Sequence, residues 1–347
     1  VGTDRCGETC GRGGDQIITT GHLVLQNGGV LDGGTTNNGN GGNIVVNASN
    51  DIVLSGTLID GTPSGFFSRT IGTTPDSGIG GEIALTAGQS MVILDGASVS
   101  ASSTGPGNAG NISIDAGNQL ILQNSSITTE ANQASGGKID LRAKNLISLV
   151  QSTISTSVLD GAGGGGDIDI QVNEQLRLVN SIISASVLGG TGSGGNVRID
   201  PNVVVLQNSQ ILAKAIQGAG GNITITTPLF LADQSSLVSA SSQFGLNGTV
   251  RIQSPTSNLS GSLGPLTSKP SQAQSLLTQR CAALANGQAS SFVVAGREQL
   301  PADPGGWLTS PLALAGLDTD PFNNETVAKG TSNLEPRTSS LSANDRV

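Results

Sequence analysis

The stretch that decides the fold is GNISIDAGNQLILQNSSI, residues 110–127, because variants of it recur along the chain. A Gly-rich pair, here Ala109-Gly110, opens the motif. An alternating segment and an L-x-L segment follow, and a polar corner leads to a third apolar position. The second member of the pair falls at Gly42, Gly81, Gly110, Gly137, Gly166, Gly195, Gly221 and Gly248. Successive spacings are 39, 29, 27, 29, 29, 26 and 27 residues, a period typical of solenoid proteins.

Apolar residues occupy three fixed positions in the repeat. The leucine column comprises Leu25, Leu54, Leu94, Leu122, Leu149, Leu178 and Leu206. The column two residues earlier comprises Leu23, Ile52, Val92, Leu120, Ile147, Leu176 and Val204, and the column five residues later comprises Val30, Ile59, Val99, Ile127, Ile154, Ile183 and Ile211. Polar residues alternate with these positions at the period of a β-strand, so we expect one face of each strand to point inward.

Stacked copies of a three-strand coil turn each apolar position into a buried column. The sequence therefore predicts an all-β fold, a single right-handed parallel β-helix of about nine rungs with three short strands each, from Gly14 to Ser254. Its sharpest corner holds Asn27, Gly56, Gly96, Asn124, Gln151, Asn180, Asn208 and Gln234. These are mostly residue types that tolerate positive φ, and we expect their side chains to stack in an amide ladder.

The remainder of the chain divides into an N-terminal flank (residues 1–13), a capping segment (255–316) and a polar tail that is expected to be disordered (317–347). An uncovered last rung presents unpaired strand edges. We therefore expect part of the capping segment to cover it. The candidate cap residues are Leu276, Leu277, Leu284, Phe292, Val294 and Trp307.

Composition limits the possible partners. Aromatic residues make up 2% of the chain, and 16 Lys and Arg against 25 Asp and Glu give a net charge of −9. An acidic chain is unsuited to nucleic acid or to an anionic membrane surface. Cys6, Cys10 and Cys281 make neither a disulfide framework nor a metal-binding pattern, and no cofactor is expected. The abundance of Ser, Thr, Asn and Gly suits a secreted solenoid.

Residues 290–304 (SSFVVAGREQLPADP), together with Cys281, resemble the C-terminal end of cyanobacterial filamentous-haemagglutinin-type exoproteins, often called S-layer family proteins. The rungs are similar as well, and the resemblance extends to about Pro311. Glu298-Gln299 stand where the family has Gly-Gly, and no counterpart of its N-terminal secretion domain precedes Gly14. The resemblance implies the C-terminal part of a non-enzymatic adhesin, secreted or on the outer cell surface. It also implies an outer-membrane transporter partner for two-partner secretion, and a cell-surface or extracellular-matrix component, such as a glycan, as ligand.

The alternative is a polysaccharide-binding or polysaccharide-active protein of the pectin lyase-like type, because such enzymes share this architecture. Their hydrolases need clustered aspartates with a histidine, and their lyases need a catalytic Arg or Lys beside acidic Ca²⁺ ligands. Here the only histidine, His22, lies in the first rung, far from any aspartate cluster. We therefore expect no catalytic residues.

Three carboxylates form the closest approach to a metal site. Stacking of adjacent rungs is expected to bring Asp140, Asp167 and Asp169 near one another, and such a group suits Ca²⁺. Lys138 and Arg198 flank the same patch and supply counter-charge. A ladder of surface charges is the favoured interpretation.

One repeat is about ten residues longer than the others, and its insertion contains Phe66, Phe67 and Arg69. Insertions in solenoids go to loops. The sequence therefore predicts an exposed aromatic tip as the contact surface of an otherwise polar rod. The alternative is that both rings fold back over the flank of the rod.

Overall fold

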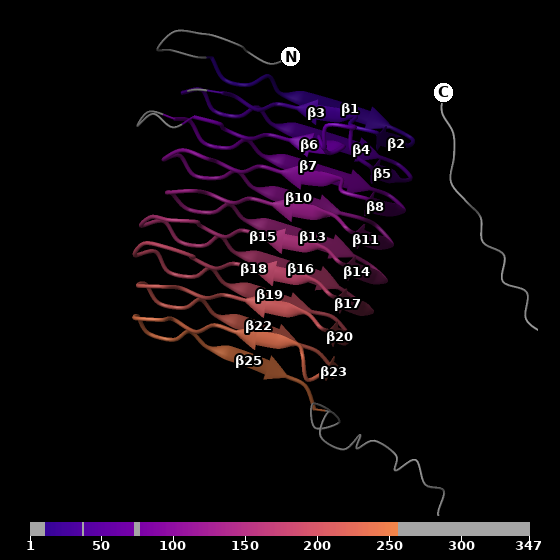
Figure 1. Cartoon of the computed structure of the whole chain (residues 1–347). Helices are drawn as coiled ribbons and strands as arrows, with labels where there is room; N and C mark the ends of the chain where they lie inside the picture. The colour runs from indigo at the N-terminus through magenta and orange to yellow at the C-terminus, as the bar shows by residue number, and fades with distance from the viewer. Residues whose placement is uncertain (1–10, 37, 73–76, 256–347) are drawn as a thin grey trace, which may run out of the picture. The chain divides into compact units, whose positions relative to one another are not determined.

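The computed structural model describes residues 11–36, 38–72 and 77–255. These residues form a parallel β-solenoid of three sheets, one strand of each sheet per turn (Figure 1). No helix that could span a membrane is found among them. The predicted parallel β-helix is confirmed.

Each sheet collects one strand from every turn. Sheet A comprises β1 (Gln16–Thr20), β4 (Ile44–Ala48), β7 (Ile83–Ala87), β10 (Ile112–Asp115), β13 (Ile139–Ala143), β16 (Ile168–Val172), β19 (Val197–Asp200), β22 (Ile223–Thr226) and β25 (Val250–Gln253). Sheet B comprises β2 (Leu23–Gln26), β5 (Ile52–Ser55), β8 (Ser90–Leu94), β11 (Gln119–Gln123), β14 (Leu146–Val150), β17 (Gln175–Val179), β20 (Val203–Gln207) and β23 (Leu229–Ala232). Sheet C comprises β3 (Val30–Asp32), β6 (Gly65–Phe67), β9 (Ser98–Ser100), β12 (Ser126–Thr128), β15 (Thr153–Ser155), β18 (Ile182–Ser184), β21 (Gln210–Leu212) and β24 (Leu237–Ser239).

The inward columns form one continuous aliphatic core. In the turn that starts at Ile112, the inward residues Leu120, Leu122 and Ile127 have no exposed surface. Each lies in register with its counterpart in the next turn, as Leu122 does with Leu149 and Ile127 with Ile154. The alternation of burial along each strand is therefore the period-two pattern of the sequence.

The corner between sheets B and C adopts the left-handed conformation that the sequence predicts. Asn124, Gln151, Asn180 and Asn208 have φ of 47–49°. Asn208 Nδ2 donates to Asn180 Oδ1 at 2.7 Å, so that step of the amide ladder is confirmed. Gln234 is not among the positive-φ residues, and the prediction is wrong there.

Two corners hold one residue more than the others, which shifts the predicted register. At Asn27-Gly28 and at Asp95-Gly96 both residues have positive φ, between 51° and 88°. The extra residue makes Leu31 rather than Val30 the inward residue of its turn, and Val30 is 42% exposed.

The extra residue at the Asp95-Gly96 corner also shifts the register of the third turn, where Leu94 and Val92 were predicted to face inward. Ile93 aligns with Leu122, and Met91 aligns with Leu120. Both Ile93 and Met91 are fully buried. A count of apolar residues alone does not detect the longer corner, because MVIL is apolar at every position.

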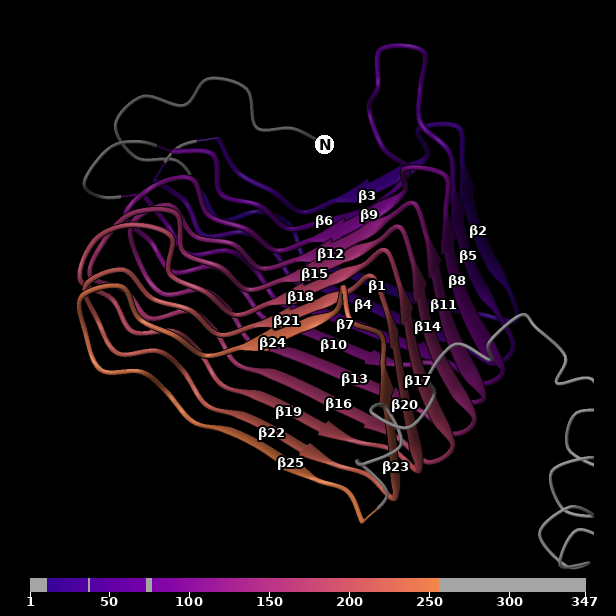
Figure 2. The same cartoon turned by 60° about the horizontal axis from the view of Figure 1, so that its bottom comes forward.

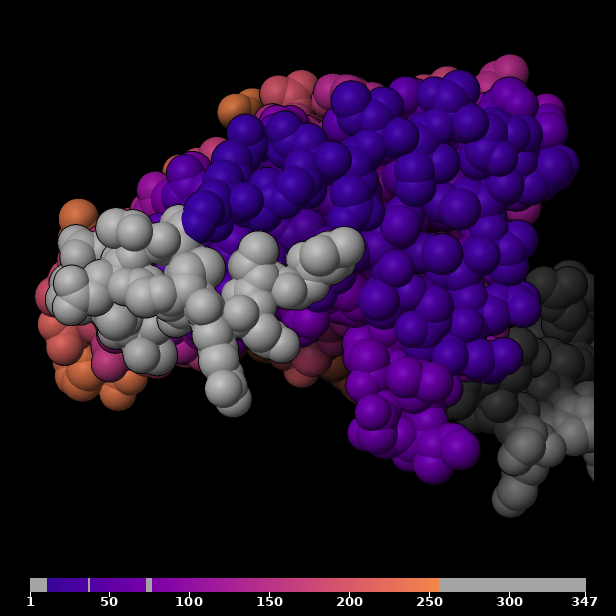
Figure 3. Space-filling view, turned by 90° about the horizontal axis from the view of Figure 1, so that it is seen from above, coloured from indigo at the N-terminus to yellow at the C-terminus, as the bar shows by residue number. Residues whose placement is uncertain are grey.

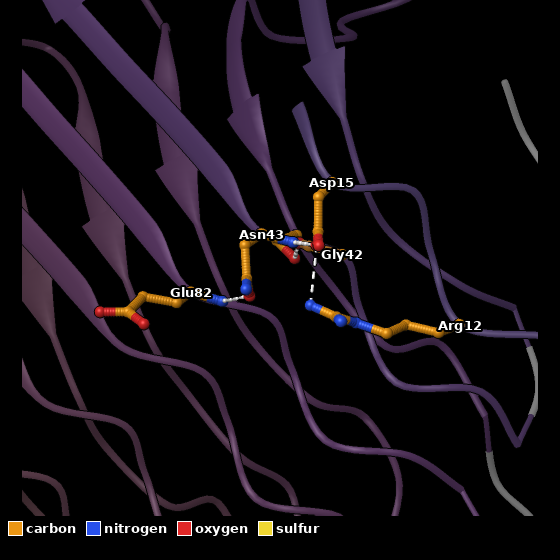
Figure 4. Close-up of polar contacts among 6 residues, drawn as sticks. Arg12, Asp15, Gly42, Asn43 and Glu82 are labelled. Atoms are coloured by element: carbon orange, nitrogen blue, oxygen red, sulfur yellow. Dashed lines mark hydrogen bonds and ion pairs between the residues drawn. The ribbon is translucent and has the colours of Figure 1, made fainter. Parts of the chain in front are cut away.

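Polar ladders satisfy backbone groups at the corners. Where the chain enters sheet A, the backbone N–H of Asn43 donates to Asp15 Oδ1 at 2.7 Å (Figure 4). The N–H of Glu82 donates to Asn43 Oδ1 at 3.0 Å, and four later turns repeat this contact. At the corner between sheets B and C, the N–H groups of Ser125, Ser152, Ser181 and Ser209 each donate to a serine hydroxyl of the next turn at 3.1–3.2 Å.

A lobe beside sheet C is a feature that the three-strand prediction did not include. After sheet C each turn extends into a further loop before it returns to sheet A (Figure 2). Single parallel bridges connect these loops at Thr35, Thr70, Ser103, Ala131, Val158 and Val187. Ala109, Ala131, Val158 and Val187 form a second, smaller core there.

The predicted cap and tail, and residues 1–10 of the flank, lie outside the described residues. On the last turn Leu231, Leu237 and Val250 are 37%, 42% and 40% exposed. The cap therefore stays a prediction.

Replacing Leu149 by Asp should lower the free energy of unfolding by at least about 4 kcal/mol, because it removes a buried side chain and leaves a carboxylate among aliphatic neighbours. Leu149 is fully buried and lies in register with Leu122 and Leu178. Chemical denaturation measures the loss. Unchanged stability would contradict the inward assignment.

Replacing Ser103 by Ala should raise the free energy of unfolding by about 1 kcal/mol. The Ser103 hydroxyl is buried and, among the described residues, has no hydrogen-bond partner. The next turn already holds Ala131 at the bridged position. As a control, Thr129→Ala should destabilise, because Thr129 Oγ1 donates to Gly137 O at 2.8 Å. If Ser103→Ala lowered the free energy of unfolding as much as Thr129→Ala does, the Ser103 hydroxyl could not be unpaired.

Candidate functional site

The predicted aromatic contact surface is corrected by the structure, which buries both rings. Phe66 is fully buried in the third inward column, between Leu31 and Val99. Phe67 is 3% exposed, and the Arg69 guanidinium lies over its ring at 4.4 Å from the centroid.

The physical reason is that the insertion precedes β6 rather than containing it. Phe66 fills the inward position that the sequence assigned to Ile59, and Ile59 is 109% exposed. Phe66 and Phe67 are therefore structural. The alternative prediction, that both rings fold back over the flank of the rod, is right about their burial but wrong about Phe66, which lies in the inward column. Arg69 covers the outward ring of Phe67 and is itself only partly exposed.

The tip of the insertion is a hairpin that stands out from the corner between sheets B and C, purple in Figures 2 and 3. Thr57 and Pro63 pair across its base, Leu58 N–H donates to Thr62 O at 2.8 Å, and Gly61 N–H donates to Leu58 O at 2.9 Å. Gly61 has φ of +87°. This is a three-residue hairpin loop closed by a glycine in the left-handed region.

Contacts at its base fix the hairpin to the rod. The Leu58 side chain lies on the Cα of Gly28, where a Cβ would be 2.1 Å from Leu58 Cγ. The buried Ser64 hydroxyl donates to Ser55 O and accepts from Gly28 N–H, both at 2.8 Å. The hairpin therefore presents Ile59 on a constrained support.

Asp60 holds the turn from within. Its Oδ1 accepts the backbone N–H of Thr62 at 2.9 Å, and this hydrogen bond lowers the pKa of the Asp60 carboxyl from its usual 3.8. A depressed pKa means that the contact is fully formed above 3.8 and is lost only as the pH falls through the lowered value. The turn therefore keeps its charge and geometry at neutral pH.

The sequence signal that was missed is the pair Asp60-Gly61. An Asp-Gly pair between apolar and β-branched residues is a strong hairpin signal. Here Leu58 and Ile59 precede it and Thr62 follows. This signal predicts that Ile59 lies at the tip of the hairpin and that the two phenylalanines belong to the strand after it.

The predicted acidic group is not assembled into a metal site. Asp140 and Asp169 are in register on β13 and β16, but Asp140 pairs with Lys138 at 2.7 Å. Asp167 lies in another column and accepts from Asn196 N–H at 2.8 Å. Within the described part of the chain, no group of three or more His, Cys, Asp or Glu residues is arranged to hold a metal ion.

His22 lies on the surface of the first turn. Its Nδ1 is 3.3 Å from Asp51 Oδ2, and its Nε2 is 3.2 Å from Asn50 Nδ2. Ser90 follows Asp51 in the same column, as the register of Leu23, Ile52 and Met91 shows. Asp51 thus separates His22 from Ser90, and the histidine-to-hydroxyl contact that activates a nucleophile is missing from this trio.

One hollow of about 610 Å³ opens at the corner that follows sheet A in the last turns. Its lining comprises Asn173, Asp200, Pro201, Asn202, Thr226, Thr227, Pro228, Gln253 and Pro255. Asp200 is the single charged residue of this lining. The hollow is shallow, three of its lining residues are prolines, and it holds no aromatic platform for a sugar.

Comparisons with known proteins find no matching family model, no matching curated protein and no matching solved structure. The resemblance of residues 290–304 to filamentous-haemagglutinin-type exoproteins thus remains a hypothesis. Those residues also lie outside the part of the chain that the structure describes.

Replacing Phe66 by Ala should lower the free energy of unfolding by about 3–5 kcal/mol, the usual cost of a buried ring. Urea denaturation measures it, and Ile59→Ala is the matched control in the same insertion, expected within about 0.5 kcal/mol of the wild type. A larger loss of stability in Ile59→Ala than in Phe66→Ala would mean that Phe66, not Ile59, is the exposed residue of the insertion.

Proposed function

We propose that the chain is a non-enzymatic adhesin or surface-structure module of filamentous-haemagglutinin type, secreted or held on the outer cell surface. Its ligand is a cell-surface or extracellular-matrix component. An outer-membrane transporter partner would deliver the full-length protein. The observation that carries the proposal is a hairpin that presents the fully exposed Ile59 on a hydrogen-bonded turn at the side of the rod.

The polar groups of the rod support this proposal. In the described turns, corner amides donate to Asn and Asp side chains of the preceding turn and to Ser side chains of the next turn. Hydroxyls on sheet C bond to each other, as Ser98 does with Ser126 at 2.9 Å and Thr128 with Ser100 at 3.1 Å. Catalytic sites instead concentrate titratable groups in a cleft. The described ladders are structural.

The hairpin supports a contact role. Interface hot spots are side chains that become fully desolvated in a well-packed pocket of the partner. Ile59 is fully exposed, while Leu58 and Ser64 anchor its support. A folded receptor with an apolar pocket would bury Ile59 with little ordering cost, because the turn is already formed.

Replacing Ile59 by Ser should weaken binding to immobilised cells or extracellular matrix at least about tenfold, the effect of a modest hot spot. Leu188→Ser is the matched control, since Leu188 is 56% exposed on a lobe loop. Both variants should unfold within about 0.5 kcal/mol of the wild type. Equal binding by Ile59→Ser and the wild type would place the adhesive surface elsewhere.

The second candidate is a polysaccharide-binding or polysaccharide-active protein, and the hollow around Asp200 is the observation that favours it. A glycan array with an assay for new reducing ends separates the two. The adhesin proposal expects no release of oligosaccharides. Release that Asp200→Asn abolishes would favour the enzyme.

A further inference from the structure

The middle of the outward face of sheet B is mostly apolar, although the inward face of the same sheet already forms the core. The middle outward column comprises Val24, Val53, Val92, Ile121, Ser148, Arg177, Val205 and Leu231. Leu94, Val150 and Val179 extend the apolar surface in the column beside it. Strands that are apolar on both faces are typical of sheets covered on both sides.

The other two sheets lack this feature over most of their length. From β10 onward, the middle outward column of sheet A comprises Ser113, Asp140, Asp169, Arg198, Thr224 and Arg251. Sheet C carries a run of outward hydroxyls from β9 to β15, several of which bond to each other, and its exposed apolar residues Val30, Ile182 and Leu237 are separated along the sheet. A nearly continuous apolar outward column is therefore a feature of sheet B, and it points to a partner on that side.

The charges on this face favour a second copy. Arg177 is exposed among the aliphatic residues, and within the described residues it makes no ion pair. Asp51, which shares the outward side with Val53, lies near the opposite end of the sheet, where one of its carboxylate oxygens, Oδ2, faces His22 Nδ1 at 3.3 Å. Counted in sheet order, Arg177 lies on the sixth strand and Asp51 adjoins the second. Two rods packed antiparallel bring Arg177 of each copy toward the partner's Asp51.

This alignment has further consequences. With the sixth strand over the second, seven of the eight strands of sheet B overlap, and β11 lies over its own counterpart. Ile121 then lies close to the two-fold axis. At about 4.8 Å per strand and 3.3 Å per residue, the overlap covers about 500 Å² on each copy, or about 1,000 Å² in total. That is about the minimum for a specific interface.

Other occupants fit less well. A sugar-binding surface would need aromatic platforms, and the outward columns of sheet B hold none. An anionic membrane would need a cationic surface, whereas the chain carries a net charge of −9. A flat aliphatic sheet is best matched by another flat aliphatic sheet.

We propose that sheet B is a self-association surface, on which two copies of the chain pack face to face with their rods antiparallel. The interface is centred on Ile121 and flanked by two Arg177–Asp51 pairs. This interface uses no residue of the hairpin tip, so the dimer is independent of the proposed adhesion.

The test is sedimentation of the full chain from about 1 to about 100 µM, since interfaces near this size can be as weak as micromolar. The wild type should reach twice the monomer mass of 34.6 kDa. Ile121→Lys should raise the dissociation constant at least about 100-fold, because two ammonium groups would meet at the axis. Ser113→Lys is the matched control, in the same turn but on sheet A, and should dimerise like the wild type.

Arg177→Glu is the second variant, at an exposed position where folding is not at risk. It should raise the dissociation constant at least about tenfold, and adding Asp51→Arg should restore most of the loss. A monomeric wild type over the whole range would overturn the proposal, including the case in which residues 256–347 of the same chain cover the face. So would dimers of Ile121→Lys or Arg177→Glu as stable as the wild type.

Discussion

Parallel stacking in register is the constraint on which the structure depends. Every inward side chain must lie over its counterpart in the next turn, because each strand bonds to the strands above and below it at about 4.8 Å. Leu122 over Leu149 and Ile127 over Ile154 are examples. A corner that gains a residue must absorb it locally, and the paired left-handed residues at Asp95 and Gly96 do so.

The sequence was sufficient to predict the fold because periodicity reports inward and outward faces directly. The prediction of inward residues failed where a local change in backbone geometry altered the number of residues between two inward positions. Ile93 and Leu94 are equally apolar, and only the left-handed pair that follows decides which of them is buried. For the same reason Ile59 was predicted to face inward and Phe66 to be exposed, whereas the structure shows the opposite. An Asp-Gly turn between them adds residues before the next inward position.

The candidate site was harder to predict than the fold. Aromatic residues are frequent in interfaces, but a solenoid with few large side chains uses Phe66 to fill its own core. Exposure of the phenylalanines depended on where the loop ended, and the spacing of the repeats does not contain that information. The outward residues of sheet B escaped notice because the leucines on either side of them dominate the pattern. Position in the register, more than residue type, therefore decides which side chains are free to bind.

The central claim is the stacked register, and a distance measured along the rod tests it most directly. Spin labels at Ser113 and Thr224 would lie on β10 and β22, four turns apart in sheet A. With Cys6, Cys10 and Cys281 replaced by Ser, pulsed electron paramagnetic resonance should give a narrow distribution corresponding to about 19 Å between the Cα atoms. A broad distribution, or one centred beyond about 30 Å, would contradict the stacked turns at about 4.8 Å spacing.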